Sequence, residues 1–182
     1  MTDSEHESPN PRAGDCGEWG IDDHRELPLM ELIYPHRLDV VIRVHALQAM
    51  DRGGPDEALS GPYGWFISQW RFAEKSGQDP QRQVRRFADL YEAMRGEGYD
   101  RDRPMTVVRS GSPHPAFLPP ERKLASLSVS YPFSLRDGAH RLAILLHFGW
   151  REATFRLVEE PAFAVPDYTT YCLERMGPHR LV

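Results

Sequence analysis

Residues 133–149 read FSLRDGAHRLAILLHFG, and this stretch decides the fold. Its first residues alternate as at the end of a strand, Asp137-Gly138 predicts a tight turn, and the apolar run at 142–148 predicts a helix ended by glycine. His140 and Arg141 fall in the first helical turn. Free backbone N–H groups, the positive end of the helix dipole and a guanidinium meet there, which suits a phosphate.

The same residues have a simpler explanation. An acidic residue before a helix is a common N-cap, so this can equally be a structural helix that Asp137 caps. His140 could then bond only to a neighbouring carboxylate. We expect His147, two turns further along the apolar helix, to be a core histidine whose hydrogen bonds are satisfied.

The motif also carries a family resemblance. Asp-Gly-Ala-His-Arg-Leu-Ala at 137–143, followed by Gly149 and a strand-like segment at 153–158, resembles the ParB/sulfiredoxin superfamily. Members carry a Gly-x-x-Arg or Asp-Gly-x-His-Arg signature at a nucleotide-phosphate site, and residues 138–141 match Gly-x-x-Arg in full. The resemblance covers mainly residues 103–158. It implies these phosphate-binding residues: Asp137, Gly138, Ala139, His140 and Arg141.

Two branches of the superfamily fit poorly. Sulfiredoxins need a thiolate between the glycine and the histidine, where this chain has Ala139, and neither Cys16 nor Cys172 lies near the motif. ParB partition proteins use Gly-Glu-Arg-Arg and continue into a helix-turn-helix domain. The residues after the last expected strand, 159–182, are too few for such a domain.

The resemblance therefore points to the ATP- or ADP-dependent small-molecule kinases typified by free-serine kinases. Phosphoryl transfer needs positioned phosphates, usually Mg²⁺, and a carboxylate that orients or deprotonates the accepting hydroxyl. Gly138, His140 and Arg141 would bind the phosphates, and Asp137 would hold the turn or contact magnesium. The partner is then a small-molecule hydroxyl substrate.

The catalytic base would come from the N-terminal region, where those kinases use a glutamate. Glu31 and Asp39 occupy roughly that region. We prefer Asp39, because it lies in a polar cluster whereas Glu31 has apolar neighbours. His140 is a further catalytic candidate.

Residues 36–50 are predicted to be a helix, although their β-branched run is also compatible with a strand. On that helix Asp39 and Arg43 stand four residues apart and can pair, and Arg37 extends the polar face. Arg37 and Arg43 are the candidate substrate-binding residues. A solvated surface with local ion pairs explains the same spacing.

Composition bounds the remaining classes. The chain has 182 residues, 40% of them apolar or aromatic, which suits one domain with a core. No apolar run approaches the ~20 residues that span a bilayer, and the N-terminus is acidic and polar, so we expect no membrane partner and a cytoplasmic location. The net charge of −5 argues against a nucleic-acid partner.

We expect a disordered or loosely packed tail over residues 1–26 and a single domain over 27–182. Residues 27–35 predict a short edge strand or a helical turn. The other expected elements are helices at 63–75, 79–98 and 167–176, strands at 104–109 and 154–158, a loop at 110–120 that includes His114, and a strand or short helix at 123–130.

This order predicts an α+β fold, a small mixed β-sheet with helices packed on it. The resemblance implies the same architecture, of ParB/sulfiredoxin-like type. Residues 36–100 exceed what a minimal ParB-like domain needs, so we expect an N-terminal helical elaboration.

Three functions remain open. The first is a nucleotide-dependent small-molecule kinase or phosphotransferase with ATP or ADP and Mg²⁺ as cofactors. The second is a nucleotide-sensing regulatory or binding protein without turnover. The third is a lyase, cyclase or accessory protein of a biosynthetic pathway that has kept the fold but not nucleotide binding.

Overall fold

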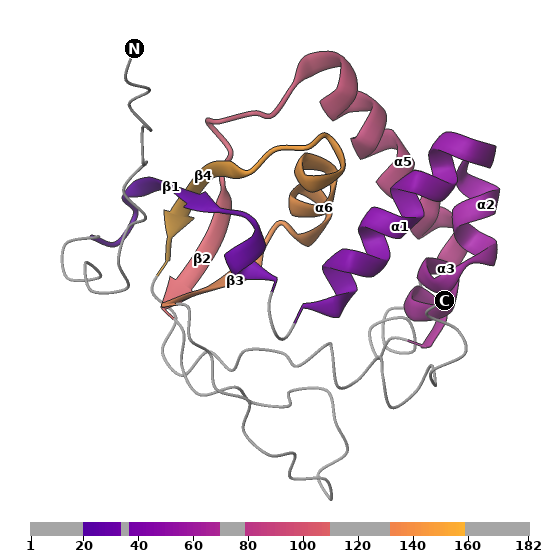
Figure 1. Ribbon diagram of the computed structural model, residues 1–182, viewed down its shortest axis with the longest axis horizontal. Coiled ribbons are helices and arrows are strands. Elements are labelled where there is room, and N and C mark those ends of the chain that lie inside the picture. Colours follow the sequence, from indigo (N-terminus) through magenta and orange to yellow (C-terminus); the bar gives the residue numbers. More distant parts are fainter. Residues whose placement is uncertain (1–19, 34–36, 70–78, 110–131, 159–182) are drawn as a thin grey trace, which may run out of the picture.

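The computed structural model describes residues 20–33, 37–69, 79–109 and 132–158, and its architecture is mixed α+β, as predicted (Figure 1). The strands are β1 (His24–Pro28), β2 (Met105–Arg109), β3 (Phe133–Asp137) and β4 (Glu152–Leu157). The helices are the 3-10 turn η1 (Met30–Leu32), α1 (Leu38–Gly53), α2 (Pro55–Ser60), α3 (Pro62–Gln69), α5 (Pro80–Glu97) and α6 (Ala139–His147).

The four strands form one small mixed sheet in the order β1-β4-β2-β3. β1 pairs antiparallel with β4, β4 pairs parallel with β2, and β2 pairs antiparallel with β3. Three β2 residues, Met105, Val107 and Val108, are almost fully buried, as expected for an inner strand. Because α6 follows β3 directly, the start of this helix lies at the edge of the sheet.

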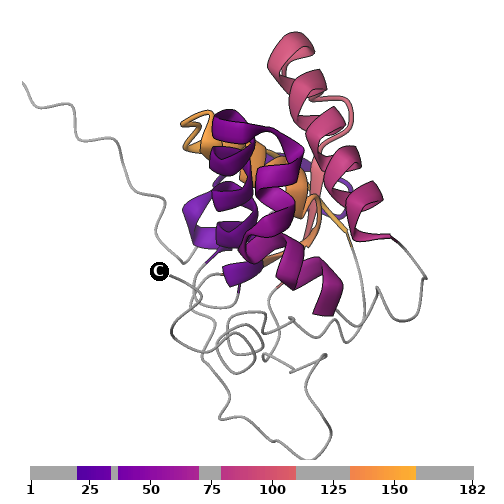
Figure 2. The same ribbon diagram turned by 90° about the vertical axis from the view of Figure 1, so that its right-hand side faces the viewer.

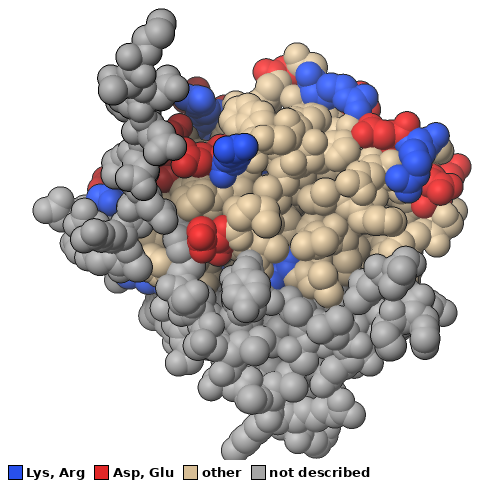
Figure 3. Space-filling view, viewed as in Figure 1, with Lys and Arg blue, Asp and Glu red and all other residues tan. Residues whose placement is uncertain are grey.

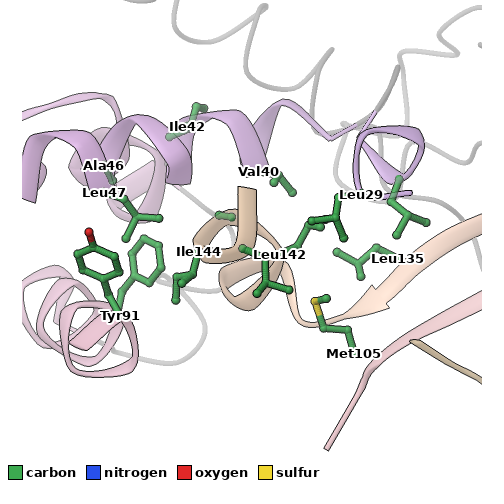
Figure 4. Close-up of a cluster of buried hydrophobic side chains, with 14 of the residues drawn as sticks. Leu29, Val40, Ile42, Ala46, Leu47, Tyr91, Met105, Leu135, Leu142 and Ile144 are labelled. Atoms are coloured by element: carbon green, nitrogen blue, oxygen red, sulfur yellow. The ribbon is translucent and has the colours of Figure 1, made fainter. Parts of the chain in front are cut away.

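Helix α6 lies between the sheet and the other helices (Figure 1). Both views show α1 beside α6 (Figures 1 and 2). In the core, Val40 and Leu47 of α1 face Leu142 and Ile144 of α6 (Figure 4). The apolar run that predicted this helix is therefore buried on several sides.

The strand-turn-helix prediction for residues 133–149 is confirmed. Gly138 has a φ of 105°, a left-handed conformation that favours glycine. A Cβ at this position would lie 2.5 Å from Cγ of Met105 on β2. Gly138 therefore serves both the turn and the close packing of the helix start against the sheet. Gly149, with a φ of 80°, follows the other end of α6.

The prediction for helix α5 is also confirmed. The Asp79 carboxylate accepts a hydrogen bond of 3.0 Å from the backbone N–H of Gln81, and Pro80 occupies the first turn. The predicted apolar stripe is buried at Val84, Phe87, Tyr91 and Met94.

Three details differ from the prediction. β1 begins at His24, inside the predicted tail of residues 1–26, because the backbone of residues 24–28 pairs with β4. Residues 27–33 form both the end of a strand and a helical turn, which the sequence offered as alternatives. Helix α2 was not predicted, because Pro55 suggested a break in the helical pattern. Pro55 instead occupies the first turn of α2, directly after Gly54, whose φ is 77°.

Several expected elements lie outside the described residues. They are the end of the helix at 63–75, the loop at 110–120 with His114, the segment at 123–130 and the helix at 167–176. Within the described ranges, no helix is both long enough and apolar enough to cross a membrane.

Candidate functional site

Asp39, in the first turn of α1, is the centre of a buried ion-pair cluster. Its side chain is 1% exposed. Arg37 binds it in bidentate fashion, with Nε 2.8 Å from Oδ1 and Nη2 3.0 Å from Oδ2. Nη1 of Arg43, one turn along the helix, lies 2.7 Å from Oδ2. One carboxylate therefore holds two guanidinium groups in place, and the residues predicted to form the polar face are brought together.

The cluster also joins the start of α1 to the sheet. Nη1 of Arg37 donates a 3.1 Å hydrogen bond to the carbonyl oxygen of Leu135, three residues before Gly138. Nη1 of Arg43 additionally donates to the Asp39 carbonyl oxygen at 2.8 Å. The local ion pairs of the alternative explanation are present, but the surface is not solvated, because both Arg37 and Asp39 are buried.

Two opposing effects act on the Asp39 carboxyl. Burial raises its pKa. The charges of Arg37 and Arg43 and the hydrogen bond from Arg37 together lower the pKa by more than burial raises it, so the pKa lies below the ordinary value. The group is ionised at neutral pH, and both of its oxygens are occupied. This geometry favours a positioning role for Asp39 over its predicted role as the base.

His140 joins the same region from the first turn of α6. Its Nε2 lies 2.9 Å from the hydroxyl oxygen of Tyr63 on α3, and its ring meets the Phe87 ring edge-on at 4.7 Å between centroids. Burial and the nearby Arg43 charge lower the pKa of His140 to about 3, while Asp39 opposes this shift. His140 is therefore neutral at physiological pH.

Arg43 has an unsatisfied donor. Its guanidinium carbon lies 5.3 Å from the centre of the Phe66 ring and 6.0 Å from that of Tyr63. Its Nε is sealed from solvent and has no hydrogen-bond partner among the residues that the structure describes. An unpaired buried donor costs about 1–3 kcal/mol, so this atom is a candidate ligand contact.

The first turn of α6 has no side-chain cap. The N-cap residue is Gly138, which has no side-chain oxygen, and Asp137 makes no capping hydrogen bond. The alternative in which Asp137 merely caps the helix is therefore wrong. The first N–H groups of a helix have no intrahelical partner, and none of the described residues accepts from those of Ala139 and His140, an arrangement that suits an anion.

Arg141 turns toward the sheet instead of toward Tyr63. Its guanidinium donates to the carbonyl oxygen of Arg103, just before β2, and its Nη2 lies 3.6 Å from the Asp137 carboxylate. The Arg141 side chain is 23% exposed, whereas that of Asp137 is 75% exposed. Arg141 is therefore reachable from solvent at the start of α6.

Other predicted residues are not gathered into this cluster. Glu31 is exposed on η1, and among the described residues it forms no hydrogen bond or ion pair with Asp39 or His140. Asp137 is a single exposed carboxylate, and the part of the chain that the structure describes holds no group of three or more potential metal ligands. On the face drawn in Figure 3, basic and acidic side chains of the described residues lie interspersed.

The sequence did not reveal Tyr63, Phe66 and Phe87 as neighbours of the motif. The aromatic helix was visible, but its contact with His140 spans 77 residues. No local pattern indicates which face of such a helix meets a partner that far along the chain.

The resemblance to the ParB/sulfiredoxin superfamily rests on the motif alone. No protein-family model matches this chain, and comparison with curated proteins and with solved structures gives no significant match.

Proposed function

We propose that the chain binds a nucleotide through its phosphates at the first turn of α6 and transfers a phosphoryl group to a small hydroxyl compound. We also infer a ParB/sulfiredoxin-like fold for the sheet and α6. The observation that carries the proposal is the uncapped first turn of α6, which begins at Gly138 and carries Arg141. A helix start with free N–H groups and an adjacent guanidinium is a common phosphate-binding arrangement.

The surroundings of that turn support an anionic ligand. Arg43 lies on the same Tyr63 ring whose hydroxyl bonds to His140, and its Nε has a donor to offer. His140 is neutral, so its ring adds a polar contact without a further buried charge. The ligand would then be attracted by Arg43, Arg141 and the helix dipole together.

In the proposed reaction the terminal phosphoryl group passes from the nucleotide to the oxygen of the acceptor hydroxyl. The bond to the bridging oxygen of the nucleotide breaks, and the proton of the hydroxyl goes to a carboxylate base. Mg²⁺ is commonly held by one or two carboxylates together with substrate phosphates, and Asp137, exposed beside Arg141, fits that role. Arg37 and Arg43 were the two candidate substrate-binding residues. Because Arg37 already bonds to Asp39 and to the Leu135 carbonyl, we expect Arg43 to contact the substrate.

The geometry separates the two candidate bases. Asp39 is engaged by two guanidinium groups, whereas Glu31 is exposed and makes no ion pair among the described residues. If Glu31 is the base, Glu31→Gln abolishes turnover and leaves nucleotide affinity unchanged. Asp39→Asn should instead loosen Arg43 and lower both turnover and nucleotide affinity. If Asp39→Asn abolished turnover while the affinity stayed unchanged, Asp39 would be the base after all.

Calorimetry with ATP, ADP and CTP tests the binding step. We expect wild type to bind one of the three and Arg141→Ala to weaken binding at least tenfold, in line with about 1.5–3 kcal/mol for a hydrogen bond to a charged group. Arg86→Ala, which removes an exposed arginine on α5, is the control for net charge. Absence of binding by wild type would remove both nucleotide-dependent functions.

A binding protein without turnover is the second candidate. The engagement of Asp39 favours it, because the most buried carboxylate near the motif is not available as a base. Phosphorus NMR of a mixture of protein, nucleotide, Mg²⁺ and a panel of small hydroxyl compounds separates the two. Phosphorylated acceptor supports the kinase, whereas tight binding with no product supports the binding protein.

A further inference from the structure

We infer that Tyr63 is a positioning residue, whose hydroxyl donates to Nε2 of His140 and thereby fixes the neutral ring with its proton on Nδ1. His140 then offers an uncharged N–H donor to a phosphate oxygen at the start of α6. This inference rests on the proposed function, because it names how the same site contacts its ligand.

The hydroxyl proton of Tyr63 decides the direction of this hydrogen bond. Tyr63 is 1% exposed, and Nε2 of His140, at 2.9 Å, is its hydrogen-bond partner among the described residues. If Nε2 carried the proton and donated to Tyr63, the proton of the buried tyrosine would have no acceptor among the described residues. Leaving such a donor unpaired costs about 1–3 kcal/mol.

The surroundings of the other ring nitrogen of His140, Nδ1, are compatible with a proton on Nδ1. No hydrogen bond to Nδ1 of His140 is present among the described residues, and His140 is only partly buried. The described residues therefore offer Nδ1 no partner that would favour one tautomer over the other. The hydroxyl of Tyr63 is the contact that selects the tautomer.

A protonated ring is disfavoured by the same neighbours. An imidazolium would direct an Nε2–H at Tyr63 and again leave the tyrosine proton without an acceptor. It would also place a second positive charge near Arg43, although Asp39 partly offsets this. Burial also raises the pKa of Tyr63, so the tyrosine keeps its proton. Both groups are neutral, and the ring proton is left on Nδ1.

The consequence concerns the ligand. Nδ1–H and the free backbone N–H groups of the first turn belong to neighbouring parts of α6, so they can share one phosphate group. A donor without charge adds a hydrogen bond but no strong electrostatic attraction. The site should therefore select a ligand that offers acceptor oxygens, such as the pyrophosphate unit of a nucleotide.

Nitrogen NMR on the ligand-free protein tests the tautomer. A long-range proton–nitrogen correlation spectrum of the His140 ring should show Nδ1 as the protonated nitrogen and Nε2 as the bare one, with no change between about pH 7 and pH 5. In Tyr63→Phe the two forms should become mixed. A protonated Nε2 in wild type would overturn the inference, and it would leave the proposed function standing.

Pyrophosphate affinity tests the role in binding. We expect Tyr63→Phe to weaken binding about fivefold, because the donor state of Nδ1 is no longer enforced. Tyr99→Phe is the matched control, since its hydroxyl bonds to Thr154 and Met105 in the sheet. His140→Asn places an amide donor near the Nδ1 position, and in that background Tyr63→Phe should cost nothing further.

The outcomes separate the two proposals. If wild type binds pyrophosphate and Tyr63→Phe changes neither affinity nor tautomer, the role of Tyr63 is refuted while the phosphate site stands. If wild type binds no pyrophosphate, the role of His140 as a donor to that group is refuted, and the calorimetry with ATP, ADP and CTP decides whether the proposed function stands. Thermal unfolding of each variant shows whether a lost affinity reflects a lost fold.

Discussion

A polar cluster lies at each end of helix α6, one around His140 at its start and one around His147 at its end. The two clusters differ in how many of their hydrogen-bonding groups have partners. At the start, within the described part of the chain, Arg43 Nε has no hydrogen-bond partner and the first backbone N–H groups have no side-chain cap. At the end, the side chains around His147 bond to one another. The comparison contrasts a cluster whose hydrogen bonds are complete with one that we propose as a ligand site.

The closed cluster joins three helices. Nε2 of His147 lies 2.8 Å from the Asp51 carboxylate of α1 and 3.1 Å from the hydroxyl of Tyr91 on α5. That hydroxyl and Nη2 of Arg95 each lie 2.8 Å from Asp51. Burial raises the pKa of Asp51, but the hydrogen bonds from Tyr91, His147 and Arg95 lower it overall. The expectation that the hydrogen bonds of His147 are satisfied is confirmed, but its expected place in the core is wrong, because its side chain is 15% exposed and that of Asp51 is 39% exposed.

The helix dipole adds to the difference. A basic residue is favoured at the C-terminal end of a helix, where His147 lies, and an anion is favoured at the N-terminal end, where His140 lies. The protein supplies an anion to the C-terminal cluster through Asp51. At the N-terminal end, the Asp137 carboxylate lies beside Arg141 instead of on the helix N–H groups.

The largest effect is expected from Asp39→Asn, which removes the anion that holds Arg37 and Arg43. Breaking a buried ion pair on one side typically costs about 3–5 kcal/mol, because the partner charge is left uncompensated. Urea unfolding followed by circular dichroism measures it. Asp137→Asn, which breaks an exposed pair with Arg141, should change stability by no more than about 0.5 kcal/mol. Equal effects would show that the Asp39 cluster does not support the fold.

Alanine at Gly138 and at Gly149 compares the two ends of α6 directly. Both glycines have a positive φ, so alanine at either position strains the backbone and lowers the free energy of unfolding. A Cβ at 138 also meets Met105, whereas one at 149 meets nothing within 4 Å. We expect Gly138→Ala to lower the unfolding free energy by about 1–3 kcal/mol more than Gly149→Ala does. Equal losses would mean that Met105 moves aside freely.

The low pKa of His140 predicts a dependence of stability on pH. Its folded pKa of about 3 lies below the ordinary 6.5, so below pH 6.5 the unfolded chain gains a proton that the folded chain does not. This contribution to stability is present above pH 6.5 and is lost as pH falls toward 3. The slope is at most about 1.4 kcal/mol per pH unit.

Comparison with His140→Asn isolates this effect from the other histidines. The difference in unfolding free energy between wild type and variant should shrink as pH falls from about 7 to about 5. A difference that stays constant over this range would show that His140 takes up its proton in the folded state as readily as in the unfolded one.

The smallest effect is expected at the closed end. Tyr91→Phe removes a hydroxyl that bonds to Asp51, but Arg95 and His147 keep that carboxylate paired, so stability should fall by about 1 kcal/mol. Pyrophosphate affinity should not change. Reduced affinity in Tyr91→Phe, with the fold intact, would show that the two ends of α6 are coupled.

Local chemistry predicted the parts of this fold that depend on neighbours in sequence. Gly138, Asp79 and the apolar run of α6 each carry their signal within a few residues, because turns, caps and helix faces are decided at that range. The ion pair of Asp39 with Arg43 was also visible as a four-residue spacing. Its burial was not, since the same spacing occurs on exposed helices. Helix α2 was missed because Pro55 suits both a break and a helix start.

The sequence by itself determined the strand, the glycine turn and the helix of residues 133–149, together with the residue types that suit a phosphate. Only the tertiary structure decided which side chains meet that turn. Tyr63 reaches His140 across 77 residues, and Arg37 reaches the Leu135 carbonyl across 98. Such contacts depend on how whole helices pack against the sheet, and packing follows from the apolar faces of all elements together. For this reason the motif predicted a candidate site, while the neutral histidine and the buried ion pairs beside it emerged only from the fold.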